Sequence, residues 1–114
     1  LCLFEATEDV HNLRPDFSAI ARLDTFALIC TAPGIGEFDF VSRFFAPGVG
    51  VDEDPVTGSA HTALVPFWAE RLGRTHFTAL QASKRTGVLH CELRGDRVIL
   101  GGHCVTVIEG HFQI

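Results

Sequence analysis

Methionine is absent from the 114 residues, and so is any long apolar run or block of basic residues. Natural translation products begin with methionine, so we expect residues upstream of Leu1 to be missing. No run approaches the roughly 20 apolar residues that span a bilayer, and no basic segment precedes an apolar one as in a signal peptide. The net charge of −5 argues against a nucleic-acid partner. The composition therefore favours a soluble protein that binds a small molecule, with no membrane association.

Closely spaced metal ligands and paired thiols are also absent. The four cysteines form no CxxC pair, and three of them lie in apolar strand patterns, so we expect buried free thiols in a reducing cytoplasm. The six histidines show no HxxxH or HExxH spacing. The sequence thus predicts neither disulfides nor a metal site. The cysteines are Cys2, Cys30, Cys91 and Cys104.

A single domain is expected over residues 1–114, of which 46% are hydrophobic and 20% charged. The central feature is an amphipathic helix that ends near Leu72, since apolar residues recur at steps of three and four. Thr57 to Ser59 suit its start and Gly73 its end, whereas Pro66 predicts a kink. The predicted apolar stripe comprises Ala60, Ala63, Leu64, Phe67, Trp68 and Leu72.

The predicted helix start is the main candidate site. Thr57 to Ser59 would expose backbone N–H groups at the positive end of the helix dipole, which suits a carboxylate or phosphate. Just upstream, Asp52, Glu53 and Asp54 crowd three carboxyls together, so we expect a raised pKa for at least one of them and a role in acid/base chemistry. His61 either contacts the ligand or guides a proton, or is a partly exposed surface histidine. An ordinary capped helix after a solvated acidic loop is the alternative.

Short strands account for most of the remaining chain. Asp16 is expected to cap a helix over Phe17–Arg22, and Arg94–Arg97 and Glu109–Gly110 are expected to be turns. The pattern indicates an α+β protein with a curved, mostly antiparallel, barrel-like sheet wrapped around one central helix. The predicted strands are Leu1–Ala6, Thr25–Thr31, Phe38–Ala46, Phe77–Ala82, Gly87–Leu93, Arg97–Leu100, His103–Ile108 and His111–Ile114.

A long segment resembles a known family. RFFAPGVGVDEDPVTGSAHTALVPFWAERLG, from Arg43 to Gly73, is similar to the signature segment of the phenazine-biosynthesis PhzF-like isomerases and epimerases. It contains Arg-x-Phe, Pro-Gly and Asp-Pro-x-Thr-Gly-Ser-Ala, and the likeness extends to Asn12–Phe17 and to the closing glycines. The resemblance implies one half of a diaminopimelate epimerase-like fold. The chain would be the C-terminal half, with the N-terminal half absent.

The same resemblance implies a cofactor-free isomerisation by proton transfer on a small carboxylate-bearing substrate. By position, Asp54 would be the catalytic residue, and Thr57, Gly58, Ser59 and Ala60 would bind substrate. The principal base, a glutamate, would belong to the absent half, so the chain alone should be inactive. Diaminopimelate epimerases use two thiols, and the absence of cysteine from residues 52–60 argues against that chemistry.

A small self-associating binding or assembly domain is the competing hypothesis. It would hold a carboxylate at the same helix start without catalysis. A homodimer is expected for the chain, because a half that exposes the surface meant for its partner seldom stays alone. Asp54 separates the two hypotheses, since only an enzyme requires its carboxylate for proton exchange.

Overall fold

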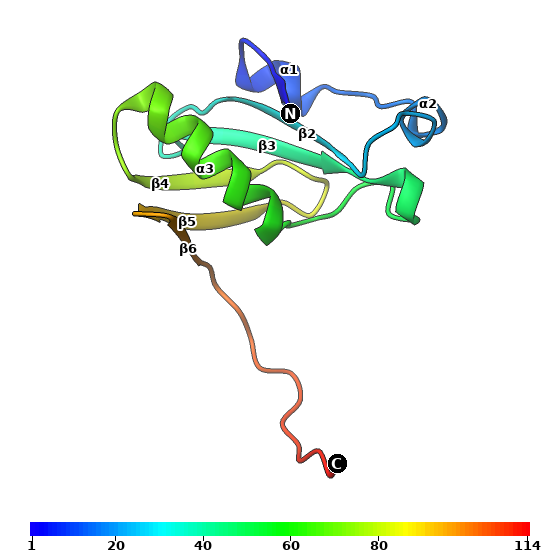
Figure 1. The fold of residues 1–114 in the computed structure, drawn as a ribbon, viewed down its shortest axis with the longest axis vertical. Helices are drawn as coiled ribbons and strands as arrows, with labels where there is room; N and C mark the ends of the chain where they lie inside the picture. The colour runs from blue at the N-terminus through cyan, green and yellow to red at the C-terminus, as the bar shows by residue number, and fades with distance from the viewer.

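The computed structural model describes all 114 residues (Figure 1). Its main element is one six-stranded sheet whose spatial order is the chain order, β1 to β6. β1 is parallel to β2 and β3 is parallel to β4, whereas the other three neighbouring pairs are antiparallel. The predicted α+β class is confirmed. The strands are β1 Cys2–Leu3, β2 Leu28–Pro33, β3 Phe40–Phe45, β4 His76–Gln81, β5 Gly87–Arg94 and β6 Arg97–Gly101.

The longest helix, α3, covers one face of the sheet and connects the parallel strands β3 and β4 (Figure 1). It spans Gly58–Leu72 and ends at Gly73, whose left-handed φ of 65° suits a residue without a Cβ. Both ends agree with the prediction, and the helix continues through Pro66. No helix of the protein is both long and apolar enough to cross a membrane. The shorter helices are α1 Thr7–His11, α2 Phe17–Ala21 and the 3-10 turn η1 Pro47–Val49.

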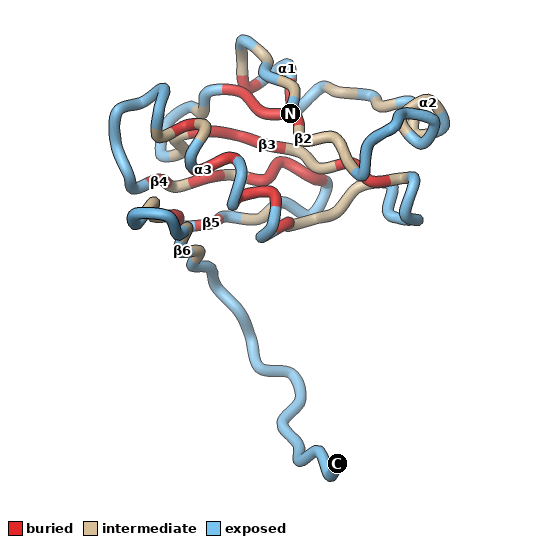
Figure 2. Tube along the Cα trace, viewed as in Figure 1, coloured by how far each residue is buried: buried red, intermediate tan, exposed pale blue.

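The main core lies between α3 and the sheet (Figure 2). Trp68 stacks on Phe40 with 5.8 Å between ring centroids and an interplanar angle of 8°, and its indole N–H donates to Thr31 Oγ1 at 3.0 Å. The buried stripe of α3 is rotated from the predicted one, because His61 and Val65 are buried, whereas Ala63 and Leu72 are exposed. The prediction counted only apolar side chains and so left out the buried histidine. The nine-residue core cluster is Phe40, Ala60, Leu64, Val65, Trp68, Phe77, Ala79, Leu89 and Cys91.

Strand β3 has buried side chains on both faces of the sheet. Phe40 faces α3, whereas Val41 packs with Val10 of α1 on the opposite face. Phe45 meets Phe17 of α2 with 6.2 Å between ring centroids. Successive side chains of β3 therefore face opposite sides of the sheet, with α3 on one side and residues of α1 and α2 packed against β3 on the other.

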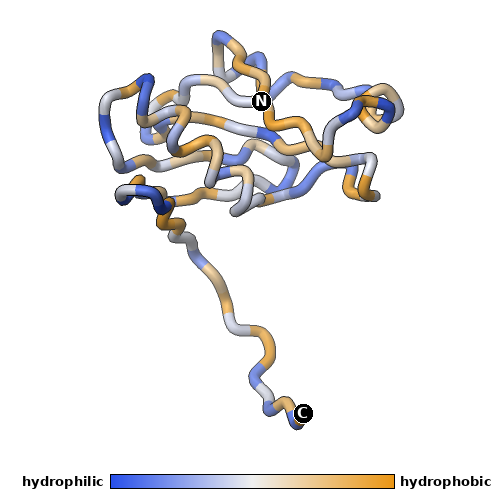
Figure 3. The backbone as a smooth tube through the Cα atoms, viewed as in Figure 1, coloured by the Kyte–Doolittle hydropathy of each residue, from blue (hydrophilic) through white to orange (hydrophobic).

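The sheet does not close around the helix. The predicted barrel-like wrap and central position of the helix are not confirmed in this chain, because β1 and β6 are open edges of the sheet. The strands expected over His103–Ile108 and His111–Ile114, and the turn at Glu109–Gly110, are wrong. Residues 102–114 form an exposed extended tail with no regular hydrogen bonding, although hydrophobic residues recur along it (Figure 3). β-branched residues favour a strand only where a neighbouring strand supplies the pairing.

Two N-terminal features also differ from the prediction. Helix α1, in whose first turn Asp9 accepts the Ala6 N–H at 3.0 Å, follows Ala6 where the sequence predicted no helix. Strand β1 is accordingly limited to two residues.

Two local predictions are confirmed. The Asp16 cap of α2 is confirmed by its 2.9 Å bond from Ala19 N, and the hairpin at Arg94–Arg97 is confirmed by the register of β5 and β6.

Candidate functional site

The candidate site lies where the parallel strands β3 and β4 end and helix α3 begins. Strand β3 leads through η1 into residues 52–57, and Asp54 N donates to Phe44 O at 3.1 Å. From the end of β4, Ser83 Oγ donates to Pro55 O at 2.8 Å. Ligands of α/β sheets commonly bind outside the carboxyl ends of parallel strands. The fold therefore fixes this loop at a position suited to binding.

Asp54 and Thr57 are joined at the start of the helix. Thr57 Oγ1 donates to Asp54 Oδ2 at 2.5 Å, and no side chain caps the helix. The N–H groups of Gly58, Ser59 and Ala60 precede the first intrahelical hydrogen bond, so they have no helical partner. An anion at this end would meet unused donors and the positive end of the dipole. The structure thus brings the predicted catalytic and substrate-binding residues together.

The predicted binding residues differ in accessibility. Gly58 and Ser59 are exposed, whereas Thr57 and Ala60 are 7% and 4% exposed. The N–H and hydroxyl of Thr57 are both donated within the protein. Direct contact with an anion at the helix start is therefore easiest for the backbone of Gly58 and Ser59.

Gln81 of β4 is a member of the site that the sequence did not reveal. Its side chain is fully buried and contacts both ends of the loop, at Asp54 and at Thr57. A glutamine in a strand carries no sequence signal for this role, because 27 residues separate it from Asp54. The parallel pairing of β3 and β4 makes the contact possible.

Glu53 is paired with a cation. Arg43 donates to both carboxylate oxygens of Glu53, at 2.7 and 2.9 Å, and its remaining nitrogen donates to Leu13 O at 2.8 Å. Their side chains are only 11% and 19% exposed. A bidentate pair of this kind is strong and directional. The loop therefore separates the neighbouring carboxyls, with Glu53 held by Arg43 and Asp54 by Thr57.

His61 is completely buried, so the expectation of a partly exposed surface histidine is wrong. Its Nδ1 lies 2.8 Å from Thr57 O, and a carbonyl can only accept, so Nδ1 carries the proton. Nε2 has no partner. Burial lowers the pKa of His61, although the bond to Thr57 opposes that shift. A neutral, buried histidine thus donates a hydrogen bond to the carbonyl of Thr57, the residue before the first turn of the helix.

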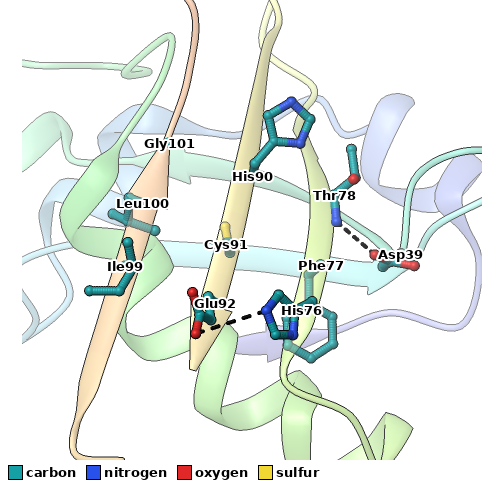
Figure 4. Close-up of a pocket in the computed structure, with 10 residues that line it drawn as sticks. All are labelled: Asp39, His76, Phe77, Thr78, His90, Cys91, Glu92, Ile99, Leu100 and Gly101. Atoms are coloured by element: carbon teal, nitrogen blue, oxygen red, sulfur yellow. Dashed lines mark hydrogen bonds and ion pairs between the residues drawn. The ribbon is translucent and has the colours of Figure 1, made fainter. Parts of the chain in front are cut away.

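A hollow of about 680 Å³ borders the helix start. Val56 and Gly58 line it next to the helix, Arg85 lines it from the connection between β4 and β5, and His103 lines it from the tail after β6. A second hollow, of about 400 Å³, lies on the opposite face of β4 to β6, where His76 is 3.9 Å from Glu92 (Figure 4). A third hollow, of about 380 Å³, is lined by Glu53 and Pro55, the two neighbours of Asp54, so the loop is bordered by the first and third hollows.

None of the four cysteines belongs to the loop that carries Asp54. Burial raises the pKa of the Cys30 and Cys91 thiols to about 11, so both are protonated at neutral pH. All four cysteines are free, Cys2 is half-buried, and Cys104 is exposed in the tail, contrary to the expectation of a buried thiol there. No three histidine, cysteine or acidic side chains lie close enough together to hold a metal ion.

Fold and site together define a class, namely α+β proteins that present an uncapped helix start beside a carboxylate at the ends of parallel strands. A family model described as phenazine biosynthesis-like protein (PhzC-PhzF) matches residues 1–110. The chain belongs to the phenazine biosynthesis-like family, which confirms the resemblance in the sequence.

Individual relatives agree with this assignment. An uncharacterized isomerase of Pseudomonas aeruginosa is 54% identical over 114 residues, which cover 100% of this chain and 43% of the relative. An uncharacterized isomerase of Halalkalibacterium halodurans is 48% identical over 111 residues, 96% of this chain and 42% of the relative. The crystal structure of a PhzF-family protein from Enterococcus faecalis superposes with a TM-score of 0.85 at 46% identity, over 88% of this chain and 38% of that one. The chain thus spans less than half the length of these relatives.

Proposed function

We propose that this chain is the C-terminal half of a PhzF-like isomerase that moves a proton on a small carboxylate-bearing substrate without a cofactor. The single observation that carries the proposal is the juxtaposition of Asp54 with the uncapped start of α3 through Thr57. The isomerase names of the relatives support the reaction class. A second half closes the site, so the 114 residues alone are inactive, and we expect them to self-associate as a homodimer in the cytoplasm.

The chemistry follows from the groups at the loop. The N–H groups of Gly58 and Ser59 bind the substrate carboxylate and stabilise negative charge that develops when a proton leaves the neighbouring carbon. Asp54 then receives or returns a proton, or holds a polar group of the substrate. The principal base comes from the other half. Positioned proton transfer of this kind contributes about 10²- to 10⁴-fold in rate.

The test measures isotope exchange in a full-length protein that contains this chain. The protein is incubated in D₂O with small carboxylic acids whose C–H bond is next to an activated carbon, and mass spectrometry follows deuterium uptake. Asp54→Asn should lower the exchange rate about 10²-fold or more while changing substrate affinity much less. Asp52→Asn is the matched control, because Asp52 is exposed and two residues away.

Equal loss of exchange and affinity in Asp54→Asn would favour a binding domain without catalysis. Carboxylate binding can be tested separately by titrating this chain with benzoate and recording backbone amide shifts. Gly58 and Ser59 should show the largest changes, and equal changes throughout the chain would contradict a site at the helix start.

A further inference from the structure

The buried carboxamide of Gln81 makes three hydrogen bonds within the loop, one accepted by its oxygen and two donated by its nitrogen. Oε1 accepts the Thr57 N–H at 2.7 Å. Nε2 donates to Asp54 O at 2.7 Å and to Thr57 Oγ1 at 3.0 Å. The side chain is 0% exposed, so water does not compete for these bonds. One side chain from β4 therefore closes the loop between Asp54 and Thr57.

The chemistry of the partners fixes the orientation of the amide. A backbone N–H can only donate, so the atom of Gln81 that faces Thr57 N must be the oxygen. The amide nitrogen then has two hydrogens, and its two acceptors are Asp54 O and Thr57 Oγ1. Thr57 Oγ1 consequently accepts from Gln81. Its own single hydrogen is left for Asp54 Oδ2, 2.5 Å away.

The hydrogen bond from Thr57 determines which oxygen of the Asp54 carboxyl group can carry a proton. Asp54 Oδ2 accepts from Thr57 and therefore carries no proton in this arrangement. Oδ1 has no hydrogen-bond partner within the chain, since the Thr57 hydroxyl is the only group bonded to this carboxylate. A proton that Asp54 gains from a substrate must then reside on Oδ1.

We propose that Gln81 is a positioning residue of the site. Through the Thr57 hydroxyl it selects Oδ1 of Asp54 as the oxygen that exchanges a proton with the substrate. This inference rests on the proposed function of Asp54, and it adds which oxygen acts and which residue selects it. Ser83, just after β4, also joins the loop to this end of the strand through its hydrogen bond to Pro55 O.

Four variants separate hydrogen-bond direction from packing. Gln81→Glu keeps the shape but removes both amide hydrogens, and Thr57→Val keeps the shape but removes the hydroxyl. Thr57→Ser retains the hydroxyl and is the conservative variant that should rescue the effect of Thr57→Val. Gln113→Glu makes the same chemical change as Gln81→Glu in the exposed tail, so it is the matched control.

The first measurement is hydrogen exchange by NMR on this chain. The Gln81 carboxamide protons should exchange with solvent at least about 100-fold more slowly than those of Gln113, because only the former are buried and bonded. In Gln81→Glu the Thr57 hydroxyl proton should exchange at least about tenfold faster, and in Gln113→Glu it should not change. Equal exchange of the two carboxamides, or an unchanged Thr57 hydroxyl in folded Gln81→Glu, would overturn the proposal.

The second measurement uses the full-length protein and the deuterium assay. Gln81→Glu and Thr57→Val should each lower kcat at least about tenfold with KM changed less than about threefold, and Thr57→Ser, which restores the hydroxyl, should have a kcat at least about threefold above that of Thr57→Val. If Gln81→Glu does not fold, the ratio of kcat between Thr57→Ser and Thr57→Val still tests whether the Thr57 hydroxyl is required. Normal kcat in folded Gln81→Glu would overturn the inference and leave the proposed function intact. Absence of exchange in the wild type would instead refute the proposed function, and the NMR comparison would still decide the hydrogen-bond direction.

Discussion

Acid should destabilise this chain through His61. The ring is completely buried, Nδ1 donates to Thr57 O, and Nε2 has no partner. Protonation would therefore place an uncompensated charge in the core, which is why burial lowers the pKa of His61. The unfolded chain, in contrast, takes up a proton near the ordinary histidine pKa of about 6.5.

The magnitude follows from the difference in bound protons. Below a pH of about 6.5 the unfolded chain holds one more proton than the folded chain, so stability falls by up to about 1.4 kcal/mol per pH unit. The fall continues until the pH reaches the lowered pKa of the folded state. From pH 7.5 to 5.5 the expected loss is at most about 1.4 kcal/mol, and above pH 7.5 this contribution is constant.

Urea unfolding at pH 7.5, 6.5 and 5.5 provides the assay, with the fluorescence of buried Trp68 as the signal. If the free energy of unfolding falls by about 1.5 kcal/mol per molar urea, the expected loss lowers the urea midpoint by about 1 M. His61→Asn is the control, because its amide can still donate to Thr57 O but does not titrate. The variant should be less stable at pH 7.5 by about 1–2 kcal/mol for the lost ring volume, and its midpoint should depend much less on pH. An equal acid-induced loss in the variant, or none in the wild type, would refute the reasoning.

Three further substitutions test the fold and the loop. Trp68→Phe should cost about 2–3 kcal/mol in thermal unfolding, because stacking area and the indole hydrogen bond are both lost; a cost below about 0.5 kcal/mol would contradict that packing. Arg43→Met should cost about 3 kcal/mol by leaving the Glu53 carboxylate unpaired and mostly buried, and adding Glu53→Gln should recover part of the loss, which a double-mutant cycle measures. Gly87→Ala should destabilise by about 1–3 kcal/mol, since its Cβ would lie 2.2 Å from Val56 Cγ2. Combining Gly87→Ala with Val56→Ala should relieve that clash. If the losses of unfolding free energy in the two single variants simply add in the double variant, the two side chains are not in contact.

Local structure was largely readable from the chain. Apolar periodicity and end signals identified α3 to within one residue, because both signals come from residues that are close together in the sequence. The strand predicted over Phe38–Ala46 was also located to within two residues, as β3 at Phe40–Phe45. The segment from Arg43 to Gly73 also carried the family resemblance and the positions of Asp54, Gly58 and Ser59.

Contacts between residues far apart in the sequence decided the structure of the tail and the environments of Gln81 and His61. The sequence could not show that residues 102–114 would remain an unpaired tail, since strand propensity acts only when another strand is available. It also could not assign Gln81 to the loop or bury His61 completely, because both depend on how α3 packs over the parallel strands β3 and β4. The sequence by itself identified the family, helix α3 and the residues that we propose for the chemistry. The tertiary structure determined which of their atoms are bonded and which remain free, because those contacts join residues far apart in sequence.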